Sequence, residues 1–302
     1  MLMVRQSVMG LIPLRTTHFA LRILPRVCKG EYHMRLGLIG EILGHSLSPK
    51  IHELLFQKMK WDSTYDLVEI PKVGFDARLR EVLDTYEGCN VTIPYKLDVI
   101  PFLDDISDEA KTIGAVNTIA TIDGKRKGFN TDYIGFKRTV AKIHGDVQGK
   151  PVDVLGHGGA SRAVIQCLYD EGASDIRVVS RHPESVSDDF LTFAKDRRVT
   201  IIGYDTLETQ PAGYLLVNTT PVGMHPKVGV SPISAKKAAT YGKVIDIIYN
   251  PEETQLLHDA IHAEKINGMY MLVMQAMAAE EIWTGKEIPE DVIMEIVREM
   301  MQ

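Results

Sequence analysis

The chain has 302 residues, of which 45% are hydrophobic and 25% are charged, and its formal net charge is −6. At about 100–200 residues per domain this length predicts two domains, and the composition is that of a globular protein rather than a disordered one. A general nucleic-acid binder would carry a basic excess, so the acidic balance argues against that class.

The three cysteines, Cys28, Cys89 and Cys167, form no CxxC pair and do not lie near histidines at ligand spacing. We therefore expect neither a disulfide framework nor a metal site, and a reducing compartment such as the cytoplasm fits. No apolar run approaches the roughly 20 residues that a transmembrane helix needs, so we expect no membrane partner.

Residues 1–33 form a basic leader, with no acidic residue before Glu31. An Arg-rich leader without acids is typical of a transit peptide. The alternative is a misassigned start or an added extension, with Met34 as the natural first residue. We favour this alternative because a compact strand begins at once, at Arg35, and we expect the leader to lie outside the two domains.

From Arg35 to about Asp132, strand-like and helix-like segments alternate. A helix is expected over Pro49–Met59, with Ser48 as its N-cap and the proline in the first helical position. Asp123-Gly124 is typical of a two-residue hairpin turn. This half is therefore predicted to be an α/β unit with a mixed sheet. Its strands are expected over Leu36–Ile39, Tyr65–Ile70, Cys89–Thr92, Thr118–Ile122 and Lys127–Phe129.

A second alternation follows the segment Gln148–Pro151, which we expect to be a hinge. Strands separated by helical crossovers predict a parallel, doubly wound sheet. Its strands are expected over Val152–Leu155, Ile176–Val179, Val199–Ile202, Tyr214–Asn218 and Val244–Ile248, and helices over Arg162–Tyr169, Met269–Trp283 and Pro289–Met300.

A glycine-rich turn, Gly156-His157-Gly158-Gly159, follows one of these strands and opens a helix. Glycines let the backbone approach a pyrophosphate, which rests on the positive end of the helix. Ser161 stands where the dinucleotide fingerprint has its third glycine, and the alternative is an ordinary strand–helix turn. The position after an apolar strand favours a dinucleotide site.

The next strand ends in Ser180-Arg181-His182, without the acidic residue that an NAD site carries about 20 residues past the glycines. The planar fork of an arginine suits the 2′-phosphate of NADP. The sequence therefore favours NADP over NAD, the alternative being that Arg181 is a solvated loop residue.

Four polar clusters follow predicted strands of the first half. Each alone could be a cap or a turn. Together they supply hydroxyls, amides, an ammonium and a carboxylate, which would suit a small polyhydroxylated acid. They are His45–Pro49, Asn90–Lys96, Gly114–Thr118 and Asn130–Asp132.

In order and spacing these motifs resemble the shikimate dehydrogenase family, from about Arg35 to Glu281. The resemblance implies an α/β enzyme with two domains, a substrate domain with a mixed sheet (34–134 plus 268–302) and a Rossmann-like NADP domain with a doubly wound parallel sheet (135–267). The motifs are Ser-x-Ser-Pro, Asn-Val-Thr-x-Pro-x-Lys, Gly-Ala-x-Asn-Thr, Asn-Thr-Asp, Gly-x-Gly-Gly-Ala, Asn218–Met224, Asp246–Pro251, and Met271-Leu272 followed by Gln275.

The resemblance also implies a reaction, the reversible NADPH-dependent reduction of 3-dehydroshikimate to shikimate in chorismate and aromatic amino acid biosynthesis. Lys96 and Asp132 would be the catalytic pair, because an ammonium stabilises a developing alkoxide and passes it a proton, and a carboxylate orients that ammonium. A surface ion pair is the alternative. No metal is required.

The remaining site residues also come from the resemblance or from the glycine turn. Ser46 and Ser48 would hold the substrate carboxylate. Thr92, Asn117, Tyr249 and Gln275 would bind its hydroxyls or ring edge. The cofactor would be held by Gly156, His157, Gly158, Gly159, Ala160, Ser180 and Arg181, with Asp108, Ile247 and Gly268 added by the resemblance alone.

Several alternatives stay open. His157 stands where the family commonly has a small residue, and it either contacts phosphate or points outward. A second arginine near Arg181 is missing, which leaves the use of NAD open. His45 and His52 are expected to be structural. A quinate/shikimate dehydrogenase and a non-catalytic nucleotide-binding regulator remain the other functions, and a homodimer is one expectation for assembly.

Overall fold

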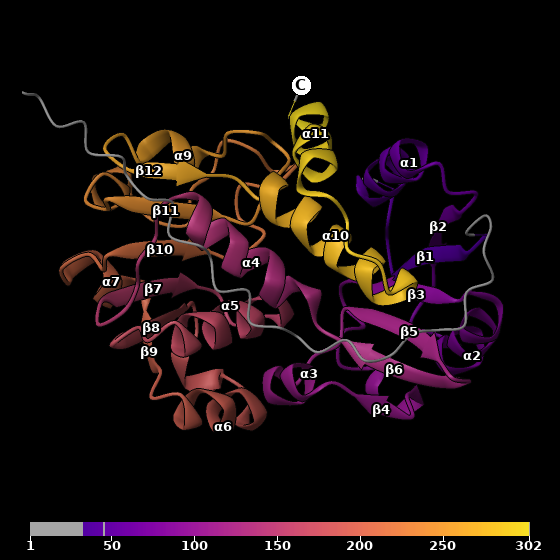
Figure 1. The fold of residues 1–302 in the computed structure, drawn as a ribbon. Coiled ribbons are helices and arrows are strands. Elements are labelled where there is room, and N and C mark those ends of the chain that lie inside the picture. The colour runs from indigo at the N-terminus through magenta and orange to yellow at the C-terminus, as the bar shows by residue number, and fades with distance from the viewer. Residues whose placement is uncertain (1–32, 45, 302) are drawn as a thin grey trace, which may run out of the picture.

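The computed structural model describes residues 33–44 and 46–301, arranged as two α/β lobes (Figure 1). The expectations for the leader up to residue 32 and for His45 lie outside the described residues. Each lobe has one six-stranded sheet, in the order β2-β1-β3-β5-β6-β4 in the first and β12-β11-β10-β7-β8-β9 in the second. The predicted class, α/β with two domains, is confirmed.

The first sheet is mixed, as predicted, because β3–β5 and β5–β6 pair antiparallel while β1–β2, β1–β3 and β4–β6 pair parallel. The hairpin turn between β5 and β6 lies at Asp123 and Gly124, whose φ angles of 51° and 74° are those a two-residue turn requires. The strands are β1 Arg35–Gly40, β2 Thr64–Glu69, β3 Gly88–Val91, β4 Asp105–Ile106, β5 Thr118–Ile122 and β6 Lys125–Phe129.

Helices from both ends of the chain cover this sheet. The C-terminal helices return to pack on α1, where Ile51 and Leu55 meet Val273 and Ile293 in one apolar cluster. The helices of this lobe are α1 Ser48–Met59, α2 Phe75–Thr85, the 3-10 turn η1 Ile100–Phe102, α3 Asp108–Ile113, α10 Met269–Thr284 and α11 Glu290–Met300.

The predicted N-cap of α1 is wrong by one residue. Leu47 already has helical backbone angles, and its carbonyl accepts a hydrogen bond from Ile51 N at 3.2 Å. Ser48 is therefore the first helical residue rather than the cap. The Ser46 hydroxyl takes part of the capping role, because it accepts from Ser48 N at 3.2 Å.

The second sheet is entirely parallel, and the strand order reverses beside β7, where open α/β sheets bind their ligands. Its elements are β7 Pro151–Leu155, α5 Gly159–Asp170, β8 Asp175–Ser180, η2 Pro183–Ser185, α6 Asp188–Asp196, β9 Thr200–Gly203, α7 Tyr204–Thr209, β10 Leu215–Asn218, α8 Ala235–Ala238, β11 Lys243–Asp246, α9 Gln255–Asp259 and β12 Glu264–Ile266.

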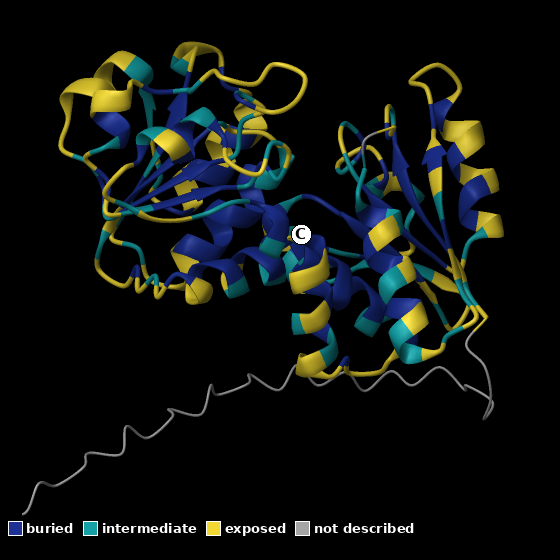
Figure 2. Cartoon of the chain, turned by 90° about the horizontal axis from the view of Figure 1, so that it is seen from above, coloured by how far each residue is buried: buried dark blue, intermediate teal, exposed yellow. Residues whose placement is uncertain are grey.

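Two helices join the lobes, α4 (Thr131–Lys142) and α10, which lie side by side in Figure 1. Phe136 and Val140 of α4 belong to the apolar core of the second lobe, while the start of α4 is bound to the first. Gly135 allows a close approach, because a Cβ there would lie 2.8 Å from the Met271 carbonyl oxygen. Figure 2 shows buried residues in both sheets and along these helices.

The predicted domain boundary between residues 134 and 135 falls inside α4, and the division into 34–134 plus 268–302 and 135–267 stays a prediction. Among the described helices, none is both long and apolar enough to cross a membrane.

Candidate active site

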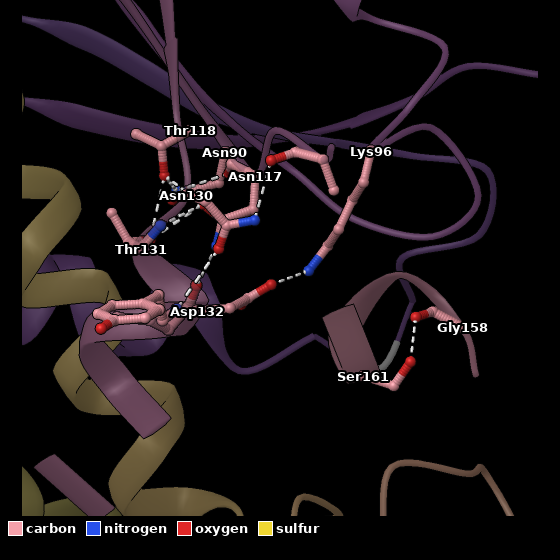
Figure 3. A network of polar contacts seen from close by, with 12 residues as sticks. Asn90, Lys96, Asn117, Thr118, Asn130, Thr131, Asp132, Gly158 and Ser161 are labelled. Atoms are coloured by element: carbon pink, nitrogen blue, oxygen red, sulfur yellow. Dashed lines mark hydrogen bonds and ion pairs between the residues drawn. The ribbon is translucent and has the colours of Figure 1, made fainter. Parts of the chain in front are cut away.

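Lys96 and Asp132 form an ion pair at the edge of the first sheet (Figure 3). Lys96 lies on the loop that follows β3, and Asp132 lies in the first turn of α4. Both side chains are nearly buried, with exposed fractions of 12% and 9%. Such burial excludes the solvated surface pair that lysine usually makes. The Nζ atom donates to Asp132 Oδ2, which orients the ammonium.

The start of α4 is fixed by the loop that precedes β5. Asn130 caps the helix by accepting from Tyr133 N, and its Nδ2 donates to the Ala115 carbonyl at 2.9 Å. Thr131 N donates to Asn117 Oδ1 at 2.7 Å. Asp132 therefore takes its place from two bonds made by its immediate neighbours.

Asn117 has a single orientation in this network. Its Oδ1 accepts from Thr131 N and, at 3.0 Å, from the Thr118 hydroxyl, so its Nδ2 faces the other way. That amide donates to Gln275 Oε1 of α10 at 3.1 Å. The structure thus brings together Asn117 and Gln275, which are 158 positions apart in the chain.

The Ser-x-Ser turn meets a residue of the second lobe. Burial raises the pKa of Tyr249, and a backbone hydrogen bond from Leu47, between the two serines, opposes that shift. Ser48 is buried. Thr92 is half-buried at the end of β3, where its N donates to Ile39 O at 2.9 Å. These predicted substrate residues therefore border one edge of the first sheet.

The glycine turn has a backbone geometry that suits an anion. Gly156 has a φ of +96°, which favours glycine, and a Cβ at Gly158 would meet nothing within 4 Å. Gly158 also caps α5 without a side-chain bond, which leaves the first backbone amides of the helix open to an anion. Ser161, in place of the third glycine, donates its hydroxyl to Gly158 O at 2.6 Å, so the serine closes the turn on itself.

This turn lies directly against the ion pair. A Cβ at Gly159 would be 3.6 Å from Lys96 Cδ, and Figure 3 shows Gly158 and Ser161 beside Lys96. A dinucleotide whose phosphates rest on α5 would therefore place its reactive end near the lysine.

Ser180 ends β8, the strand next to β7, and Arg181 follows it directly. Arg181 is exposed. Burial raises the pKa of the Tyr204 phenol, and the positive charge of Arg181 opposes that rise. The Ser180 hydroxyl accepts from His182 N at 3.1 Å and retains its own proton to donate. This tip fits a 2′-phosphate, which needs a cation and donors.

The other predicted cofactor residues differ in placement. His157 is exposed, with its ring 5.5 Å from that of Phe190 in α6. Asp108 is exposed at the start of α3 and pairs with Lys111 at 3.8 Å. Gly268 and Ile247 belong together, because a Cβ at Gly268 would fall 1.9 Å from Ile247 O.

Asp246 is a buried carboxylate that the sequence analysis did not assign. It accepts from Asn218 Nδ2 at 3.0 Å, Ile248 N at 3.1 Å and Thr254 Oγ1 at 2.7 Å. Burial raises its pKa to about 6, against the effect of those three bonds. It holds the loop that carries Ile247 and Tyr249. An acid at the end of an apolar strand is the signal that could have identified it.

His52, expected to be structural, is buried in α1 and pairs through Nδ1 with Glu280 Oε1 of α10 at 2.6 Å. Within the described ranges, the histidines, cysteines and carboxylates form no group of three or more that could hold a metal ion.

Comparison with known proteins identifies close relatives. The model of the shikimate dehydrogenase substrate binding domain matches residues 38–119, and that of the shikimate 5′-dehydrogenase C-terminal domain matches residues 268–298. The chain is 45% identical over 250 residues to a shikimate dehydrogenase (NADP(+)) of Clostridium beijerinckii, covering 82% of this chain and 90% of that protein.

Two solved structures share the fold over most of both chains. A chorismate mutase/shikimate 5-dehydrogenase fusion protein from Clostridium acetobutylicum has a TM-score of 0.82 and 41% identity, covering 89% of this chain and 97% of the other. Shikimate 5-dehydrogenase from Thermus thermophilus, in complex with NADP(H) and shikimate, has a TM-score of 0.77 and 31% identity, covering 88% and 99%.

Proposed function

The chain belongs to the shikimate dehydrogenase family, and we propose that it catalyses the reversible, NADPH-dependent reduction of 3-dehydroshikimate to shikimate. The observation that carries the proposal is the contact between the glycine turn and the Lys96–Asp132 pair, with 3.6 Å from Lys96 Cδ to the Cβ position of Gly159. A dinucleotide bound at the turn would then bring its hydride donor to the same carbonyl that receives the proton of Lys96.

In this proposal, Ser46 and Ser48 hold the substrate carboxylate, and four other residues bind its hydroxyls and ring. These six residues together form the substrate cradle. NADPH supplies the hydride when bound. As negative charge develops on the carbonyl oxygen, the Lys96 ammonium stabilises it and passes a proton from Nζ. Asp132 accepts from that Nζ throughout, which keeps the ammonium aimed at the oxygen. The four residues of the substrate cradle that would bind the hydroxyls and ring are Thr92, Asn117, Tyr249 and Gln275.

The cofactor would be held by the glycine turn and the end of β8. The backbone of Gly156–Ala160 at the start of α5 would bind the pyrophosphate, with His157 beside it. Arg181 and Ser180 would bind the 2′-phosphate. Ile247 and Gly268, whose backbones lie against each other, would border the cofactor, and Asp108 would approach it from α3.

The proposal also includes the domain division, the binding partners and the cellular compartment. Residues 34–134 with 268–302 form the substrate domain, and residues 135–267 form the NADP domain. The partner is the small-molecule substrate, with neither nucleic acid nor a membrane, and the compartment is the cytoplasm. A homodimer is a separate expectation, which the molar mass from light scattering during size-exclusion chromatography would test.

The test is a spectrophotometric screen of shikimate and quinate, each with NADP and NAD. Shikimate with NADP should give the highest kcat/KM. Higher kcat/KM with quinate would replace the proposal by the dual-specificity enzyme, and cofactor binding without turnover of any pair would replace it by the nucleotide-binding regulator. Lys96→Ala should lose turnover, whereas Lys137→Ala, which removes an exposed partner of Glu171 on α4, should retain it.

A further inference from the structure

Tyr65 lies in β2, outside every residue assigned to the site, yet its phenol is bonded to the polar network that holds Asn117. We infer that Tyr65 is a positioning residue, which supports the orientation of Asn117 through a directed chain of hydrogen bonds. The inference rests on the proposed function, because Asn117 is a group that would bind a substrate hydroxyl.

The chain begins at the phenol oxygen. Burial raises the pKa of Tyr65 well above its ordinary value. The phenol keeps its own proton and donates it to Asn90 Oδ1 at 2.7 Å.

Asn90 passes this orientation on. Because its Oδ1 accepts from Tyr65, its Nδ2 points toward β5, where it donates to Thr118 Oγ1 at 3.0 Å and to Asn117 O at 3.3 Å. Thr118 in turn donates to Asn117 Oδ1 at 3.0 Å. The Tyr65 proton thus decides which end of the Asn90 amide faces Thr118.

The chain of hydrogen bonds ends in the substrate cradle, at Asn117. Thr118 is one of the donors that hold Asn117 Oδ1 from inside, beside Thr131 N, so the amide N–H of Asn117 faces Gln275 and the substrate. A series in which each group donates to the next polarises its members in one direction, which strengthens every bond in it. Asn90 and Thr118 are buried, with exposed fractions of 5% and 0%, so water does not compete for these bonds.

The ring of Tyr65 is held independently of its hydroxyl. The His52 ring stacks on it, with centroids 3.8 Å apart and planes 9° apart, and the Trp283 ring lies 6.5 Å away. His52 is itself fixed by Glu280 of α10. Replacing Tyr65 by phenylalanine should therefore remove the proton without moving the ring, and the variant should fold.

The test compares Tyr65→Phe with Tyr241→Phe. Tyr241 is 1% exposed and donates to Asp153 Oδ2 at 2.8 Å inside the second lobe, so it matches the loss of a buried phenol bond far from the cradle. Tyr65→Phe should raise the KM for shikimate about 3- to 10-fold, the factor for one neutral hydrogen bond, with the KM for NADP unchanged. Tyr241→Phe should change neither KM.

A merely structural role would lower the melting temperature without separating the two KM values. An unchanged KM for shikimate in Tyr65→Phe, or an equal rise in both KM values, would overturn the inference. In an Asn117→Ala background, Tyr65→Phe should add much less to the KM, since the chain then ends before the substrate. A rise as large as in the wild-type background would also overturn it.

The two proposals fail separately. A wild-type protein that does not oxidise shikimate with NADP refutes the proposed function, whereas an active wild type with an unaffected Tyr65→Phe variant refutes the positioning role alone.

Discussion

Gly135→Ala tests the crossing of α4 and α10, because both helices carry site residues. The added Cβ would lie 2.8 Å from Met271 O, 3.1 Å from Gln275 Cβ and 3.2 Å from Gln275 N. Reaching an ordinary contact of 3.4 Å would require the carbonyl to move by about 0.6 Å. Backbone atoms of a helix cannot rotate away as a side chain can, so α10 has to shift as a unit.

The shift acts on both stability and binding. Overpacking costs about 1–3 kcal/mol, offset by about 0.5–1 kcal/mol from replacing glycine in a helix, so we expect a small net loss of stability. The Asn117–Gln275 bond of 3.1 Å would lengthen or break. The KM for shikimate should therefore rise about 3- to 10-fold, while the KM for NADP stays the same.

Thermal melts and steady-state kinetics on the purified chain measure both effects. Gly242→Ala is the matched control, because a Cβ there would meet nothing within 4 Å, and it should leave both KM values unchanged. A Gly135→Ala protein with wild-type melting temperature and wild-type KM for shikimate would refute the reasoning, since α10 would then tolerate the methyl group without moving.

Three further variants test the site. Lys96→Ala should lower kcat by about 10²–10⁴, the range for losing a general acid, with the KM for shikimate much less changed, and Asp132→Asn should lower kcat and also raise that KM. Both are read from initial rates, and a wild-type kcat in Lys96→Ala would exclude the lysine as proton carrier. Arg181→Ala should raise the KM for NADPH by roughly one to two decades and leave the KM for NADH nearly unchanged, and equal losses would contradict the phosphate assignment. Because the pKa of Asp246 is raised to about 6 in the fold, the native state holds its proton more tightly than the unfolded chain, so this contribution to stability is present near pH 4 and is lost as the pH rises through 6. Urea unfolding at pH 4, 5 and 6 should show that loss in the wild type and a flatter profile in Asp246→Asn, and parallel profiles would contradict it.

Much of the fold could be predicted because local sequence patterns, such as apolar runs and turn residues, determine many of its elements. The apolar runs of β7 and β10 and the Asp123-Gly124 turn each predicted an element that the structure contains. β4 and β12 were missed, because they have two and three residues, mostly polar. The cap of α1 was misplaced because Ser46 and Ser48 are both good capping residues, and the backbone of Leu47 decides between them.

The candidate site divides in the same way. Lys96 and Asp132 stand in recognisable motifs, and the structure places them together. Tyr65 and Asn90 belong to strands β2 and β3, which pair with β1 in parallel register. Their contact depends on that register across 25 positions of the chain, which no local pattern encodes. Asp246 was missed in part for a similar reason, since one of its partners, Asn218, lies 28 positions away on β10.

The position of α4 has a consequence for protein engineering. Asp132 lies in the first turn of this helix, bound to the first lobe, and Phe136, one turn later, is fully buried in the core of the second. The lobes are therefore not interchangeable modules. A chimera that takes a new nucleotide lobe at the boundary of residue 134 would separate the carboxylate from the packing that holds its helix. A junction after Lys142 would keep the whole helix with its native lobe, but the grafted core would then have to accommodate Phe136 and Val140 as foreign side chains.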